Sequence, residues 1–179
     1  GLLRSVLIDN PLATSKTNGG IKMNLSEAVG KYQALKSAGH NKDAATLKSS
    51  IAKTVQQNDG NTLVFSNPQE VASLIDVLFD TGQIFSISWV RKTNSSKPEG
   101  KKAGEVDVMT IKKHSGYVKG TSNGAKQAKN IIAGRVAVWV CNGKLQDGGF
   151  GNWRTPYAKD IVALSFGGAK VGVNIVELN

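Results

Sequence analysis

The strongest constraint on the fold is a change of hydrophobic period at Gly82. Before this residue, apolar side chains recur at the spacing of a helix with one buried face. After it, they alternate with polar side chains, as they do in a half-buried strand. We therefore expect an α+β protein in which about three N-terminal helices are followed by an antiparallel β part.

The three helical segments have clear starts and ends. Asn24 precedes the first segment, with Glu27 three residues later as a capping box. The second begins near Lys42, and the third begins at Asn67 with Pro68 in its first turn. A glycine follows the end of each segment, at Gly39, Gly60 and Gly82. Between the second and third segments, "TLVF" could pair as a short strand.

The β part consists of short runs joined by glycine-rich connections, which favour a small barrel or a sandwich. The runs are "QIFSISWVRKT", "GEVDVMTIKK", "RVAVWVCN", "DIVALSF" and "AKVGVNIVEL". We divide the chain into an N-terminal arm over residues 1–22, a helical segment over 23–82 and a β segment over 83–179. The arm has the composition of a linker and is either disordered or ordered by a neighbour.

The net charge of the chain is +10, and most of the surplus lies in one stretch. Residues 91–129 contain ten Lys and Arg against three acidic residues, a surplus of +7. An uneven surplus of this size indicates a polyanionic partner such as DNA, RNA or an acidic membrane face. No apolar run approaches the roughly 20 residues that span a bilayer, and we expect nucleic acid as the partner and no membrane.

Most of these cations fall in two polar loops, 94–104 and 114–130, which extend from neighbouring strands and would form one positively charged rim. Lysine loops with Gly and Ser fit phosphates without fixed geometry, so they would bind the backbone of DNA or RNA with little reading of sequence. The expected nucleic-acid contacts are Arg91, Lys92, Lys97, Lys101, Lys102, Lys112, Lys113, Tyr117, Lys119, Lys126, Lys129, Trp153 and Arg154.

Aromatic side chains could add stacking platforms for unpaired bases. Tyr117, Trp153 and Tyr157 are the candidates, and for Trp153 core packing and surface stacking stay equally open. Trp89 and Trp139 lie on apolar strands and are expected in the core. Because aromatic residues make up 6% of the chain, an extended stacking groove is not expected.

The sequence lacks the groups that an enzyme would show. It contains no nucleotide-binding, hydrolase or metalloprotease motif, and neither histidine has the spacing of a metal ligand. Asp76 and Asp80 are one helical turn apart and are interpreted as part of a solvated helix face, and nothing places Asp107 and Asp160 together. We predict no enzyme activity, no metal and no cofactor.

The single cysteine, Cys141, cannot form a disulfide within the chain, which favours an intracellular protein or one enclosed in a particle. Cys141 follows the apolar run "RVAVWV". We therefore expect it to be a small core or strand-end residue rather than a reactive thiol.

Six short motifs follow one another in the β segment. They are Trp89–Thr93, Gly104–Ile111, Tyr117–Gly120, Val136–Asn142, Trp153–Arg154 and Asp160–Phe166. In this order, over about residues 85–166, the chain resembles the SH3-like β-barrel proteins of tailed bacteriophages, including crAss-like ones. The resemblance implies a small SH3-like antiparallel barrel, a viral origin, and neither metal nor catalysis. The basic insert "NSSKPEGKKAG" and the missing acidic residue after "VWV" depart from the family.

Two functions follow from these patterns. The first is a non-enzymatic nucleic-acid-binding accessory protein of phage type, which contacts phosphates through the lysine-rich loops. The second is a structural or assembly component of a virus particle, in which the N-terminal arm contacts other subunits or other phage proteins. Self-association is plausible in either case, because a small sheet leaves edges that must be covered or paired. The protein would act in the host cytoplasm or inside the particle.

Overall fold

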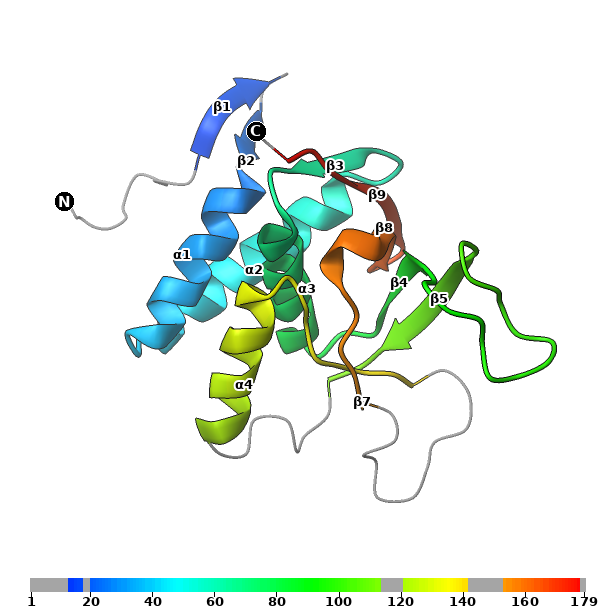
Figure 1. Ribbon diagram of the computed structural model, residues 1–179. Helices are drawn as coiled ribbons and strands as arrows, with labels where there is room; N and C mark the ends of the chain where they lie inside the picture. The colour runs from blue at the N-terminus through cyan, green and yellow to red at the C-terminus, as the bar shows by residue number, and fades with distance from the viewer. Residues whose placement is uncertain (1–12, 18–19, 114–120, 142–152, 178–179) are drawn as a thin grey trace.

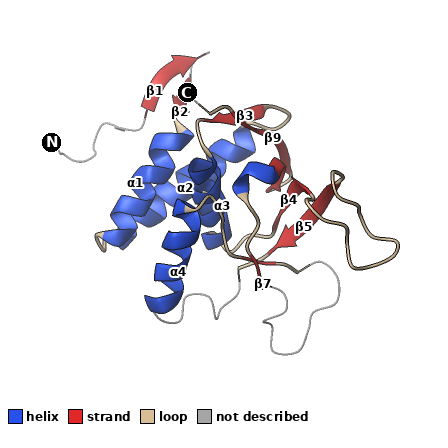
Figure 2. Ribbon diagram, viewed as in Figure 1, coloured by secondary structure: helices blue, strands red, loops and turns tan. Residues whose placement is uncertain are grey.

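Four α-helices and a five-stranded sheet form the described parts of the molecule (Figure 1). The structure is a computed structural model, and it describes residues 13–17, 20–113, 121–141 and 153–177. The helices lie to one side of the sheet (Figure 2). The predicted α+β class is therefore confirmed.

The first and third N-terminal helices begin directly after the predicted capping residues, and the second begins one residue before the predicted Lys42. The three helices are α1 (Leu25–Ser37), α2 (Asn41–Gln57) and α3 (Pro68–Asp80). The Asn24 side chain accepts a hydrogen bond from the backbone N–H of Glu27 at 3.3 Å, and Asn67 accepts one from Glu70 at 3.0 Å. Both contacts satisfy N–H groups that have no partner within a helix's first turn.

The main sheet has the strand order β3-β9-β8-β4-β5. Its strands are β3 (Thr62–Phe65), β4 (Phe85–Val90), β5 (Val106–Ile111), β8 (Ile161–Phe166) and β9 (Ala169–Ile175). The β3–β9 pair is parallel and the other pairs are antiparallel. The "TLVF" strand between α2 and α3 thus joins the sheet at its edge, so the N-terminal helical segment and the β segment share one sheet.

The described strands do not close into the expected SH3-like barrel, because β3 and β5 stand at the two edges of an open sheet. Helices supply the reason. One face of the sheet, including Ile87 and Phe166, packs into the same core as Val29, Leu74 and Ile75 of the helices. A sheet whose apolar face is covered by helices has no need to close on itself.

Three shorter elements complete the described β part. Strands β6 (Val138–Trp139) and β7 (Trp153–Arg154) pair with each other, and Ile111 of β5 forms a single bridge with Val140. A 3₁₀ turn, η3 (Ala158–Asp160), then leads directly into β8. Trp139 is buried and Cys141 packs partly buried against the core, as their places beside apolar runs predicted.

Helix α4 (Thr121–Ile132) corrects the prediction of a polar loop over 114–130, because residues 121–130 are helical. Serine, asparagine and glycine at the start of this segment gave it the composition of a loop. Gln127 and Ile131 are four residues apart and both turn toward the core, but Gln127 is polar, so the apolar period that would indicate a helix is absent from the sequence here. Residues 114–120 lie outside the described residues.

The N-terminal arm includes a two-stranded antiparallel sheet of β1 (Ala13–Thr17) and β2 (Gly20–Met23), and β2 leads into α1 (Figure 1). The rest of the predicted arm, 1–12 and 18–19, is outside the described residues. Within the ranges described, none of the helices combines the length and apolarity that a membrane span needs.

Candidate nucleic-acid interface

Three cationic side chains surround one exposed tyrosine ring. Tyr157 stands just before η3, and its side chain is 41% exposed. The Nζ of Lys92 lies 4.6 Å from the ring centroid, the guanidinium carbon of Arg135 lies 5.1 Å away, and the Nζ of Lys159 lies 5.6 Å away. We call these four residues the tyrosine cluster. Cations are attracted to the face of an aromatic ring at such distances.

The backbone places the cluster. Lys92 lies two residues beyond the end of β4, and its Nζ is 3.6 Å from a carboxylate oxygen of Asp160 in η3. Arg135 and Tyr157 face each other across an antiparallel bridge. The Nη2 of Arg135 donates to the hydroxyl of Thr155 at 2.9 Å, which fixes the guanidinium. Asp160 is the one carboxylate that forms an ion pair with the cluster among the described residues.

Beside Lys92 begins the connection between β4 and β5, residues 91–105, which we call the basic hairpin. Backbone hydrogen bonds between Arg91 and Glu105 (3.0 Å) and between Arg91 and Gly104 (2.7 Å) close its base. Further out, the Ser95 N–H donates to the carbonyl of Lys101 at 2.8 Å. The predicted polar loop over 94–104 therefore has backbone hydrogen bonds of its own.

The five cations of the basic hairpin differ in how much of their charge is compensated. Arg91 forms an ion pair with Asp107 at 2.9 Å, and its guanidinium lies 5.0 Å from the ring of Trp89. The side chains at the tip are exposed and form no ion pair with other described residues. They belong to Lys97, Lys101 and Lys102. Their charge is therefore available to a partner.

The described parts of the two basic segments do not form the single rim that the sequence predicted. The basic hairpin enters β5 at Val106, whereas Lys112 and Lys113 follow its last residue, Ile111. A strand of this length separates its ends by about 17 Å. Lys126 and Lys129 lie exposed on α4, away from the hairpin in Figure 1. The predicted contacts in the hairpin therefore lie apart from those that follow β5 and those on α4.

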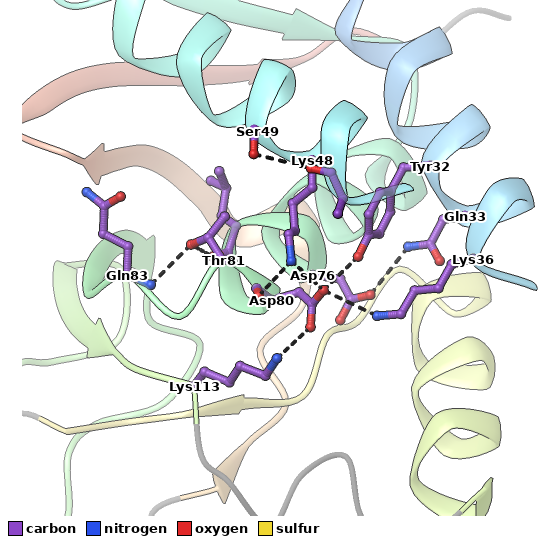
Figure 3. A network of polar contacts seen from close by, with 12 residues as sticks. Tyr32, Gln33, Lys36, Lys48, Ser49, Asp76, Asp80, Thr81, Gln83 and Lys113 are labelled. Atoms are coloured by element: carbon purple, nitrogen blue, oxygen red, sulfur yellow. Dashed lines mark hydrogen bonds and ion pairs between the residues drawn. The ribbon is translucent and has the colours of Figure 1, made fainter. Parts of the chain in front are cut away.

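Lys113 is one of three lysines that converge on Asp80 at the end of α3 (Figure 3). Its Nζ lies 2.8 Å from Oδ1 of Asp80, while Lys36 at 3.4 Å and Lys48 at 3.3 Å approach Oδ2. The hydroxyl of Tyr32 donates to the same Oδ2 at 2.7 Å. We call these five residues the Asp80 network. It joins α1, α2, α3 and the segment after β5.

Asp80 is held ionised by its partners. Desolvation acts to raise its pKa, but hydrogen bonds from Lys113 and Tyr32 and the charge of Lys36 outweigh it and hold the pKa well below its usual value. The pKa of Tyr32 is raised, first by burial and then by its hydrogen bond to the Asp80 carboxylate. The ion pairs and hydrogen bonds of the Asp80 network therefore hold α1, α2, α3 and the segment after β5 together.

Asp76, one turn earlier, has the opposite environment. Burial raises the pKa of Asp76, although two amide donors oppose this effect. The Nε2 of Gln127 donates to Oδ1 at 2.9 Å, and that of Gln33 donates to Oδ2 at 3.3 Å. The interpretation of Asp76 and Asp80 as a solvated helix face is wrong, because α1 and α4 pack over this side of α3.

The structure separates the predicted aromatic platforms. Trp153 is half-buried and packs against the core, with its ring 6.2 Å from that of Phe79 and 5.5 Å from that of Trp139. Arg154 is exposed next to it, with a hydrogen bond of 2.9 Å from its guanidinium to the carbonyl of Trp153. Tyr117 and Lys119 lie outside the described residues.

The predicted contacts did not include Arg135 and Lys159, and Tyr157 was considered as a stacking candidate without its cations. A signal for Lys159 was present in "YAKD", where a lysine and an aromatic follow Pro156. Arg135 had no such signal, because its place beside Tyr157 depends on a bridge between two residues that are 22 positions apart in the chain.

No family model, no curated protein and no solved structure matches the chain. The resemblance to phage SH3-like proteins thus stays a prediction. Among the residues with a described position, no group of three or more His, Cys, Asp and Glu is placed to hold a metal ion.

Proposed function

We propose that the protein binds nucleic acid without catalysing a reaction, and that the basic hairpin and the tyrosine cluster contact the phosphate backbone. The proposal is based on a contrast between cations that form ion pairs within the protein and cations that do not. Lys97, Lys101 and Lys102 extend into solvent without an ion pair among the described residues, next to a cluster with three cations and one carboxylate.

The chemistry of these groups suits a polyphosphate backbone. Lysine ammonium groups on flexible stems bind phosphates as point charges, with affinity that comes from the release of counterions. Such contacts read little of the base sequence. Arg135, fixed by Thr155, adds one cation of defined direction. The expected activity is thus binding with low sequence specificity and strong dependence on salt.

The position of the hairpin supports the same proposal. Its base is closed by backbone hydrogen bonds, so the three tip lysines start from a defined place on the molecule. Lys112 is exposed at the other end of β5, and Lys113 is bound by Asp80. We therefore assign the main interface to the end of β5 that joins the basic hairpin, and we do not include Lys113 in it.

A titration with two charge-matched variants tests the proposal. Labelled single- and double-stranded DNA and RNA are titrated by fluorescence anisotropy at about 50 and about 200 mM salt. One variant carries Lys97→Ala, Lys101→Ala and Lys102→Ala. The control carries the same changes at exposed lysines of α1 and α2, two helices that lie apart from the hairpin in Figure 1. These lysines are Lys31, Lys42 and Lys53.

We expect wild-type affinity to fall by about a decade or more over this salt range. The hairpin variant should bind at least about tenfold more weakly at low salt and flatten the slope of log K against log salt by about two, while the control keeps the wild-type slope. Equal losses in both variants would indicate a response to net charge alone. Absence of binding at low salt would overturn the proposal.

The same salt series weighs the second candidate, a structural or assembly component of a virus particle. Its support is the N-terminal hairpin, where β1 and β2 form a sheet of their own with outer edges that no other described strand covers. Such edges can pair with a strand of a neighbouring subunit. Assembly through strand pairing should persist at high salt, in contrast to binding through phosphates.

A further inference from the structure

We infer that the preferred ligand is a single strand and that Tyr157 stacks against one of its unpaired bases. This inference rests on the proposed function and adds the class of nucleic acid and the residue that selects it. Binding by lysines alone does not distinguish a single strand from a duplex, whereas an exposed aromatic ring does, because bases within a duplex are already stacked on one another.

Tyr157, at 41%, is the most exposed aromatic residue in the described ranges. The other described rings are buried or, like Trp89 and Trp153, packed partly buried against the core. An exposed ring offers a flat apolar face on which an unpaired base can stack. The setting of Tyr157 among three cations points to a partner that combines an apolar flat face with negative charge, and an unpaired nucleotide has both.

The backbone around Tyr157 is held firmly, although its ring is exposed. The carbonyl of Pro156 accepts from the N–H of Val136 at 3.3 Å, and the N–H of Ala158 donates to the carbonyl of Gly134 at 2.8 Å. Ala158 is fully buried. A tyrosine has few rotatable bonds, so a ring on an anchored backbone loses little conformational entropy when a base stacks on it.

The cations around Tyr157 are placed to bind the phosphates on either side of the stacked base. The Lys92 side chain is 49% exposed and Lys159 is also exposed, so both ammonium groups can leave the ring for a phosphate. Arg135 cannot move as freely, since Thr155 and the bridge to Tyr157 fix it. An exposed aromatic ring beside exposed cations is the combination that single-strand binding uses.

The test uses Tyr157→Leu, which removes the ring, and Tyr157→Phe, which keeps it. Each variant is titrated with an oligothymidylate of about 16 nucleotides and with its duplex with oligoadenylate at low salt. We expect wild-type protein to favour the single strand, Tyr157→Leu to lose about tenfold in single-strand affinity with its duplex affinity and salt slope unchanged, and Tyr157→Phe to bind as wild type does.

A second readout does not depend on a variant. A single strand with one 2-aminopurine base should lose fluorescence on binding wild-type protein, because stacking quenches this base.

If Tyr157→Leu binds the single strand as tightly as wild type while the hairpin variant loses affinity, the stacking role is overturned and the proposed function stands. If wild-type protein binds neither oligonucleotide at low salt, both are overturned.

Discussion

The Asp80 network and the basic hairpin each contain three lysines of the same formal charge, yet their surroundings differ. Lys36, Lys48 and Lys113 lie within 3.4 Å of one carboxylate and connect helices to the end of β5. The lysines at the hairpin tip have no such partner among the described residues. A surplus of charge in a sequence therefore does not locate an interface, since part of that charge stabilises the fold.

Asp80→Asn should cause the largest loss of stability. The substitution leaves three ammonium groups and the Tyr32 hydroxyl facing a neutral side chain, and we expect a loss of about 2 kcal/mol in the free energy of unfolding. Chemical denaturation at neutral pH measures it. The hairpin triple variant is the control and should unfold as wild type does.

The pH dependence of that loss has a defined sign. Because the folded-state pKa of Asp80 is lowered, its contribution is fully present above the ordinary value of 3.8 and is lost as pH falls toward the folded pKa. The difference in stability between wild type and Asp80→Asn should therefore shrink as the solution is acidified below pH 3.8. A difference that is constant with pH would show that Asp80 does not act through its charge.

A smaller effect of opposite sign is expected from Asp76→Asn. The folded-state pKa of Asp76 is raised, so stability falls as pH rises from 3.8 through the folded pKa, and the cost is fully present above it. At neutral pH the variant should be as stable as wild type or up to about 1 kcal/mol more stable. A marked loss of stability would contradict the raised pKa.

The hydrogen bonds around Asp76 allow this substitution. Gln127 cannot turn its amide, since its Oε1 accepts from the N–H of Ala137 at 2.9 Å. An asparagine oxygen can accept from the Nε2 of Gln127, and a rotated Gln33 amide can accept from the asparagine nitrogen. Urea unfolding curves of both proteins at several pH values give the comparison.

The smallest expected effect on stability distinguishes Lys113 from Lys112, its neighbour in the sequence. We expect Lys113→Gln to lower the free energy of unfolding by about 1 kcal/mol, because it removes the 2.8 Å ion pair with Asp80. Lys112→Gln should stay within about 0.5 kcal/mol of wild type, because the Lys112 side chain is exposed. Equal thermal stability of the two variants would contradict the assignment of Lys113 to the fold.

The elements with local signals could be predicted from the sequence. Asn24 and Asn67 mark helix starts because a capping side chain acts within a few residues of itself. Alternation over "SISWV" and "VDVMTI" likewise gives the β4–β5 pair. Helix α4 was missed, because Gln127, a polar residue, occupies the buried face, where the periodicity of apolar residues gives no signal.

The candidate site depends on contacts between distant segments, which the sequence does not display. Lys92, Arg135 and Lys159 meet at Tyr157 through a strand end, a bridge and a 3₁₀ turn. Asp80 collects lysines from 44 residues before it to 33 residues after it. Charge and aromatic content indicated a class of partner, but the position of the interface required the fold.

Lysine footprinting tests the assignment of the interface most directly, because it reports on the hairpin lysines and on exposed helical lysines in one sample. The protein is acetylated briefly with and without a saturating single-stranded oligonucleotide, and mass spectrometry gives the rate at each lysine. We predict that the oligonucleotide slows acetylation at Lys97, Lys101 and Lys102 severalfold and leaves Lys31 and Lys53 unchanged. Protection of the helical lysines, with the hairpin lysines unaffected, would contradict the account.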